Sequence, residues 1–115
     1  MSPYDQVKLA SGLNIVAAVW LFISAFAVPM NLELAWSNAL VAVVIGILAA
    51  IRAGGTYDQS WMSWVNVVLG VWVVVSPWML AVSPAETLVI NNVATGVIIA
   101  ILAAWSALAI QTARA

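Results

Sequence analysis

The side chains best suited to chemistry in this sequence are amides, hydroxyls and indoles set inside four long apolar segments. A carboxamide carries two donors and an acceptor, and hydrocarbon satisfies none of them. One interpretation is interhelical pairing, at about 0.6–2 kcal/mol per bond; the alternative is a polar lining for a neutral solute. We favour pairing, because it is the common use of such residues. Each segment holds one of these amides: Asn14, Asn38, Asn66 and Asn92.

Groups that support catalysis or metal binding are scarce in the chain. It contains no histidine and no cysteine, which excludes disulfides, thiolate chemistry and imidazole ligation of a metal or haem. No nucleophile–base pair, carboxylate pair or phosphate-binding glycine loop is visible. We therefore expect no catalytic residue, no metal ligand and no cofactor, and a protein that is not an enzyme. No ionisable group is predicted inside a span, which argues against proton-coupled or charged-substrate transport.

The composition is that of a membrane protein. Of the 115 residues, 66% are hydrophobic and 6% are charged, so most of the chain must be solvated by lipid. With a net charge of −1, the chain has no excess of basic residues that would bind the phosphates of nucleic acid. Segments of about 20 residues span a hydrocarbon core of about 30 Å. The sequence therefore predicts an all-α, integral membrane four-helix bundle, with spans near residues 9–28, 34–51, 61–80 and 88–110.

The second half of the sequence repeats the first. Tyr4-Asp5-Gln6 recurs as Tyr57-Asp58-Gln59, 53 positions later, and residues 38–50 align with residues 92–104. We predict two tandem two-helix repeats, residues 1–53 and 54–115, in one membrane domain. Because each repeat has an even number of spans, the repeats are parallel rather than inverted. Residues 8–27 also resemble a signal peptide, but the repeat aligns Ala25–Ala27 with the third segment, so we expect this segment to be retained.

A motif ends the third segment. Ser76-Pro77-Trp78, preceded by Asn66, Gly70 and Trp72, resembles the signature of the SPW repeat family of small bacterial membrane proteins. That resemblance implies a two-helix repeat with the motif in its first helix, and it covers both halves. The first half has Ser24-Ala25-Phe26 at the equivalent positions. The resemblance implies fold and location but no activity. From the residues themselves, Pro77 removes the amide that would bond to the Val73 carbonyl, so the helix should loosen there unless Ser76 compensates.

Small residues recur on single helix faces. Asn38, Ala42, Gly46 and Ala50 are spaced by four, as are Asn92, Gly96, Ala100 and Ala104. This spacing is typical of close helix packing in membranes, where small side chains let backbones approach. A groove for a lipid or pigment is the alternative use of the same face. We expect packing, and we include three glycines as candidate packing residues: Gly46, Gly70 and Gly96.

Two tryptophans do not fit the interfacial aromatic belts. Trp20 and Trp72 each fall well inside a predicted span, whereas Trp36, Trp78 and Trp61 lie near span ends. A buried indole needs a partner for its N–H. We interpret both as packing residues between the repeats; the alternative is that they stack on a flat apolar ligand such as a quinone or carotenoid.

The basic residues predict an orientation. Lys8, Arg52 and Arg114 all fall on one side of a four-span topology, so the positive-inside rule places both termini in the cytoplasm. The leading hypothesis is a non-enzymatic protein of a bacterial inner membrane that contacts lipid and acts through helix–helix contacts. It would be an assembly or accessory subunit of a membrane-protein partner, or a homo-oligomer. The rival is a passive pathway or binding site for a small neutral or lipid-like molecule.

Overall fold

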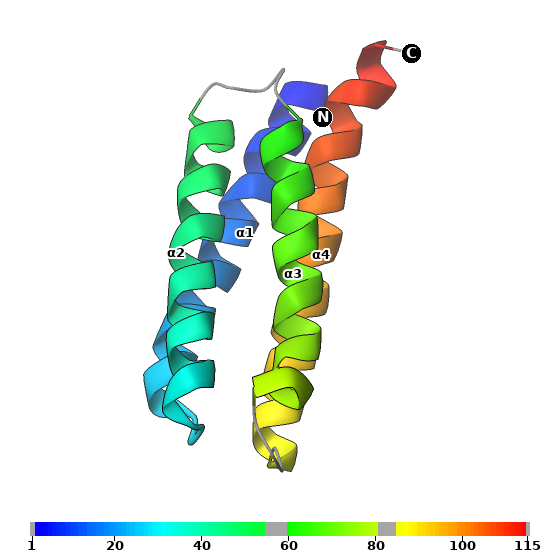
Figure 1. The fold of residues 1–115 in the computed structure, drawn as a ribbon. Coiled ribbons are helices and arrows are strands. Elements are labelled where there is room, and N and C mark those ends of the chain that lie inside the picture. Colours follow the sequence, from blue (N-terminus) through cyan, green and yellow to red (C-terminus); the bar gives the residue numbers. More distant parts are fainter. Residues whose placement is uncertain (1, 55–59, 81–84, 115) are drawn as a thin grey trace.

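Four long helices make up the described part of the chain. The computed structural model describes residues 2–54, 60–80 and 85–114, with side chains described as far as Ala109. Successive helices run in opposite directions, and the two termini lie at the same end of the bundle (Figure 1). The molecule is elongated, 46 × 21 × 19 Å. The helices are α1 (Pro3–Ala27), α2 (Leu32–Ala53), α3 (Trp61–Leu80) and α4 (Glu86–Arg114).

Each helix packs against two neighbours. The ring of contacts runs α1–α2, α2–α3, α3–α4 and α4–α1, with α3–α4 the most extensive interface and α2–α3 the least. All four helices are long and apolar enough to cross a membrane. The predicted all-α, membrane-spanning four-helix bundle is confirmed, and the arrangement is compatible with two tandem two-helix repeats.

The ends of the helices differ in part from those predicted. The bounds of α3 match the prediction, but residues 3–7, which precede the predicted first span, belong to α1. Helix α1 begins early because Ser2 caps it: the Asp5 amide donates to Ser2 Oγ at 3.1 Å, and Pro3 occupies the first helical position. At the other end α1 stops at Ala27, ahead of Pro29.

The expected connections are only partly within the described residues. Leu32 and Glu33, which lie between the first two predicted spans, belong to the first turn of α2. The repeated triplet 57–59, and residues 83–84 between the third and fourth predicted spans, lie outside the described residues. Gly54 follows α2 as its C-cap residue, and its amide donates to the Ala50 carbonyl.

The interior contains an apolar layer at mid-bundle. It is formed by six buried residues drawn from all four helices. Large apolar side chains also cover the outside of the bundle, where Val16, Leu32, Val68 and Ile101 are all more than half exposed. An apolar outer surface around a partly polar interior is the arrangement that lipid requires. The apolar layer consists of Ala18, Leu21, Ala42, Ile45, Val73 and Ile99.

Candidate functional site

Polar side chains gather at the end of the bundle opposite the termini, in a group we call the outer amide cluster (Asn38, Ser76 and Asn92). Asn38 Nδ2 donates to Asn92 Oδ1 at 3.1 Å, and Asn92 Nδ2 donates back to Asn38 Oδ1 at 3.3 Å. Asn92 Nδ2 also lies 3.3 Å from Ser76 Oγ. All three residues are fully buried. The cluster joins α2, α3 and α4 through bonds that each satisfy a group the membrane would otherwise leave unpaired.

The Ser-Pro-Trp motif has a clear structural role in this cluster. Pro77 lacks an amide, so the Val73 carbonyl one turn earlier has no helical donor. Ser76 Oγ donates to this carbonyl at 3.1 Å, and Asn92 Nδ2 donates to it at 3.2 Å. Helix α3 therefore continues through Pro77 to Leu80. The proline turns a backbone carbonyl into an acceptor for a neighbouring helix.

The first half uses the same serine without the proline. Ser24 Oγ donates to the Leu21 carbonyl at 2.9 Å, the counterpart of the bond from Ser76. Ala25 stands where Pro77 stands in the second half and keeps its amide. Asn38 Nδ2 reaches the Met30 sulfur at 3.7 Å. The acceptor created by the motif is therefore particular to the second half.

The two midspan tryptophans make equivalent contacts. Trp20 Nε1 donates to Asn91 Oδ1, and Trp72 Nε1 donates to Ser37 Oγ, both at 2.9 Å. Asn91 and Ser37 are 54 positions apart, the offset that aligns the second helices of the two halves. Each bond connects the first helix of one half to the second helix of the other. These contacts satisfy the indole N–H groups and tie the halves together.

A second polar group lies toward the end of the bundle that carries the termini; we call it the inner polar cluster (Ser11, Arg52, Ser63 and Ser106). The Ser11 and Ser63 hydroxyls each lie 3.0 Å from the Ser106 hydroxyl. Arg52 Nη2 donates to the Ser106 carbonyl at 3.1 Å, and Arg52 is fully buried. All three serines are at least 97% buried.

Arg52 corrects the expectation that no ionisable group lies within a span. The sequence placed it at a helix end, and it does lie in the last turn of α2, but its side chain turns into the bundle. There the charge faces the carboxyl end of α2, where the helix dipole favours a cation. The alignment of the halves held a signal for this cluster, since Ser11 aligns with Ser63 and Arg52 with Ser106.

Asn14 and Asn66 lie between the inner polar cluster and the apolar layer. Each is 2% exposed. Asn66 Nδ2 donates to the Ile45 carbonyl of α2 at 3.2 Å. The Oδ1 atoms of both asparagines have no hydrogen-bond partner among the described residues.

The polar residues do not form a continuous lining. Along α1 the order is Ser11, Asn14, then Ala18 and Leu21, and finally Ser24. Ala18 and Leu21 belong to the apolar layer, which separates the two polar clusters. A hydrogen-bonded path for a neutral solute along the bundle axis would have to cross that layer. This arrangement favours helix pairing as the role of the asparagines.

The candidate packing glycines lie in two different settings. A Cβ at Gly96 would meet the Gly70 carbonyl oxygen at 2.6 Å and the Val74 amide at 2.9 Å, and a Cβ at Gly70 would meet the Gly96 oxygen at 2.9 Å. Helices α3 and α4 therefore touch backbone to backbone. The close approach expected at Gly46 is not present, because a Cβ there would lie 3.7 Å from the Ala18 Cβ, an ordinary contact.

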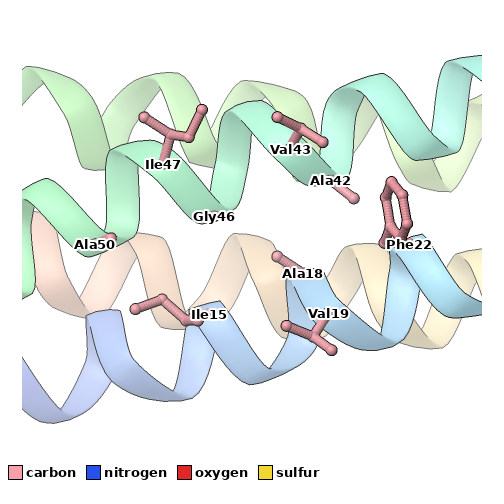
Figure 2. Close-up of a pocket in the computed structure, with 9 residues that line it drawn as sticks. All are labelled: Ile15, Ala18, Val19, Phe22, Ala42, Val43, Gly46, Ile47 and Ala50. Atoms are coloured by element: carbon pink, nitrogen blue, oxygen red, sulfur yellow. The ribbon is translucent and has the colours of Figure 1, made fainter.

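Gly46 instead lies on an apolar hollow between α1 and α2, which we call the α1–α2 groove. Its volume is about 340 Å³. Small residues of both helices line it together with larger apolar side chains such as Phe22 and Ile47, which are about half exposed. Figure 2 shows the lining residues on the facing sides of the two helices, all of them apolar: Ile15, Ala18, Val19, Phe22, Ala42, Val43, Gly46, Ile47 and Ala50.

A second hollow, of about 440 Å³, lies between α1 and α4. Trp20 lines it together with Thr95 and apolar residues that include Leu13 and Ile98. The indole is 49% exposed, so one part of it faces the groove while its N–H bonds to Asn91.

Comparison with known protein families supports the resemblance that the Ser-Pro-Trp motif suggested. The model of the SPW repeat domain matches residues 8–106, which is most of the chain and includes parts of all four helices. No curated protein and no solved structure matches the chain.

Proposed function

Because the chain belongs to the SPW repeat family and has four helices that can cross a membrane, we propose that it acts within the membrane through lateral helix–helix contacts. It does so without enzymatic activity. The α1–α2 groove receives a transmembrane helix of another subunit. The protein is then an assembly or accessory subunit of a membrane complex, or a homo-oligomer built on the same contact.

The observation that carries this proposal is the different use of the small-residue face in the two halves. On α4, Gly96 is covered by α3, whose backbone lies against it. On α2, the aligned stripe borders an open groove in which Gly46 is only partly covered and Ala50 is exposed. Small residues that line a groove at membrane depth allow another helix to approach closely, which is how transmembrane helices associate.

The experiment is purification from native membranes in mild detergent, comparing the wild-type protein with a variant in which the groove is filled. Gly46→Leu should place a side chain in the groove and release the partner, while the protein itself stays folded. Gly12→Leu is the matched control, since it makes the same change on α1 at a glycine with nothing within 4 Å of its Cβ position. Equal partner recovery from wild type and Gly46→Leu would contradict the proposal.

A second candidate function is binding of a lipid-like molecule, favoured by the hollow beside Trp20. Its lining is largely apolar and includes the Trp20 indole, which suits a flat or chain-like apolar ligand. Mass spectrometry of organic extracts of the same purified samples distinguishes binding of a lipid-like molecule from binding of a partner helix. A retained small molecule without a protein partner supports this candidate.

The proposed location is a bacterial inner membrane, with both termini in the cytoplasm. The positive-inside rule supports this, as does the position of both termini at one end of the bundle (Figure 1). We expect a cysteine at Gly55 to be protected from an impermeant thiol reagent in intact cells, and a cysteine at Ala85 to react. The reverse labelling pattern would contradict the orientation.

The proposed organisation is two repeats, residues 1–53 and 54–115, related by a twofold axis along the membrane normal. The equivalent bonds of Trp20 and Trp72 support it. The pairing of Asn38 with its aligned residue, Asn92, supports it as well, because residues related by a twofold axis can meet each other only on that axis.

A further inference from the structure

In the described part of the chain, two buried oxygen atoms in the inner half of the bundle lack hydrogen-bond donors. They are the Oδ1 atoms of Asn14 on α1 and Asn66 on α3. Both residues are 98% buried and occupy aligned positions in the two halves of the sequence. A buried amide oxygen without a donor carries a desolvation cost that native proteins avoid, commonly by binding an ordered water. Because the unpaired oxygen is the same atom at aligned positions of the two halves, we looked for one ligand that both oxygens could bind.

The serines one turn before Asn14 and Asn66 indicate which sides of α1 and α3 face the bundle interior. Ser11 and Ser63 lie three residues before Asn14 and Asn66, on the same faces of α1 and α3. Their hydroxyls contact a single atom, Ser106 Oγ, each at 3.0 Å. The two faces therefore both reach α4 inside the bundle at that level. Asn14 and Asn66, each almost completely buried, face the bundle interior one turn further toward the apolar layer.

The chemistry of the surroundings selects the ligand. Two oxygen acceptors require a molecule with two donor hydrogens. A metal cation is disfavoured because the Arg52 guanidinium lies close by, at the Ser106 carbonyl, and no carboxylate lies among the described residues of the inner polar cluster. The near-complete burial of both asparagines keeps lipid and larger solutes away from their side chains. Water has two donor hydrogens, no charge and the required dimensions.

We propose that Asn14 and Asn66 form a hydration site in which a water on the bundle axis donates one hydrogen to each Oδ1 atom. The apolar layer closes this site on its outer side through Leu21 and Val73, both fully buried. The bundle is therefore hydrated internally on one side of that layer. On the other side Asn38 and Asn92 satisfy each other directly, so their amides need no bridging water.

Water-edited solid-state NMR of the full-length protein in bilayers, labelled at asparagine, tests this site. Magnetisation from water should reach the side-chain amides of Asn14 and Asn66 before it reaches those of Asn38 and Asn92. The comparison is matched for depth, because three of the four residues lie at nearly the same distance from a helix end. Asn66 lies five residues after the first residue of α3, and Asn38 and Asn92 each lie six residues after the first residue of their helices. Transfer to Asn38 and Asn92 as early as to Asn14 and Asn66 would overturn the proposal.

A variant tests whether one water serves both residues. In Asn14→Leu the water loses one of its two acceptors, so transfer to the Asn66 amide should fall toward the level of Asn38. Ser24→Ala, on the outer side of the apolar layer of the same helix, should leave the Asn66 signal unchanged. An Asn66 signal of wild-type strength in a folded Asn14→Leu protein would rule out a shared water.

Discussion

Gly96→Leu should prevent the bundle from folding, because α3 and α4 touch at this position without room for any side chain. The first added carbon would already lie 2.6 Å from the Gly70 carbonyl oxygen and 2.7 Å from Val74 Cγ2. Backbone atoms cannot move aside as a flexible side chain would, so the most extensive helix interface of the molecule would have to separate. We expect a loss beyond the roughly 1–3 kcal/mol typical of overpacked cores.

The matched control is Gly46→Leu, which makes the same substitution in the aligned stripe of α2. Its Cβ would meet only the Ala18 Cβ, at 3.7 Å, and the rest of the side chain would enter the α1–α2 groove. Replacing a helical glycine also removes an unfavourable propensity of about 1 kcal/mol. Thermal melts in detergent should show a folded Gly46→Leu protein and little folded Gly96→Leu. Similar melting temperatures for the two variants would contradict the close approach of α3 and α4.

Asn92→Leu should give the largest loss of stability among the asparagine variants. It removes the bond accepted from Asn38 and the two donor hydrogens of Nδ2, which are shared among Asn38 Oδ1, the Val73 carbonyl and Ser76 Oγ. Asn38 Oδ1 would then be left without a donor in a fully buried position. Membrane side-chain bonds contribute about 0.6–2 kcal/mol each, so we expect a loss of about 3 kcal/mol or more.

Asn66→Leu is the comparison for this variant. Asn66 is buried like Asn92, but within the described ranges its side chain bonds only to the Ile45 carbonyl, and its Oδ1 atom has no partner there. We expect a loss of about 1–2 kcal/mol. The difference is measured by the midpoints of unfolding in detergent. If Asn66→Leu were the more destabilised protein, the outer amide cluster would not be the main polar connection between the helices.

Much of the fold could be predicted because lipid restricts the choices. Apolar segments of about 20 residues can only be helices when no water is available to the backbone, and four of them occur here. The freed Val73 carbonyl and the role of Ser76 also followed from local chemistry, since a proline affects the carbonyl one turn before it. The second donor, Asn92, is 19 positions away, and only the packing of α4 against α3 brings it there.

The candidate packing residues show where the sequence could not decide. Gly46 and Gly96 lie in stripes with the same spacing, so both were expected at close contacts. The difference comes from the facing helix: Gly70 brings α3 against α4, whereas Ala18 faces Gly46 on α1 with a Cβ already in place. Arg52 was likewise assigned to a flank because it ends an apolar segment. Its side chain is fully buried and donates to the Ser106 carbonyl of α4, 54 positions away, a contact that sequence position does not reveal.

The central claim, that a helix of another subunit occupies the α1–α2 groove, is tested most directly by site-specific photo-cross-linking in native membranes. A benzophenone amino acid at Ile47, on the groove, is compared with one at Val68, an exposed position on α3 outside it. We predict a discrete protein–protein adduct from Ile47, absent when Gly46 is also changed to leucine, and no such adduct from Val68. Only lipid adducts from Ile47, or the same protein adduct from both positions, would contradict the account.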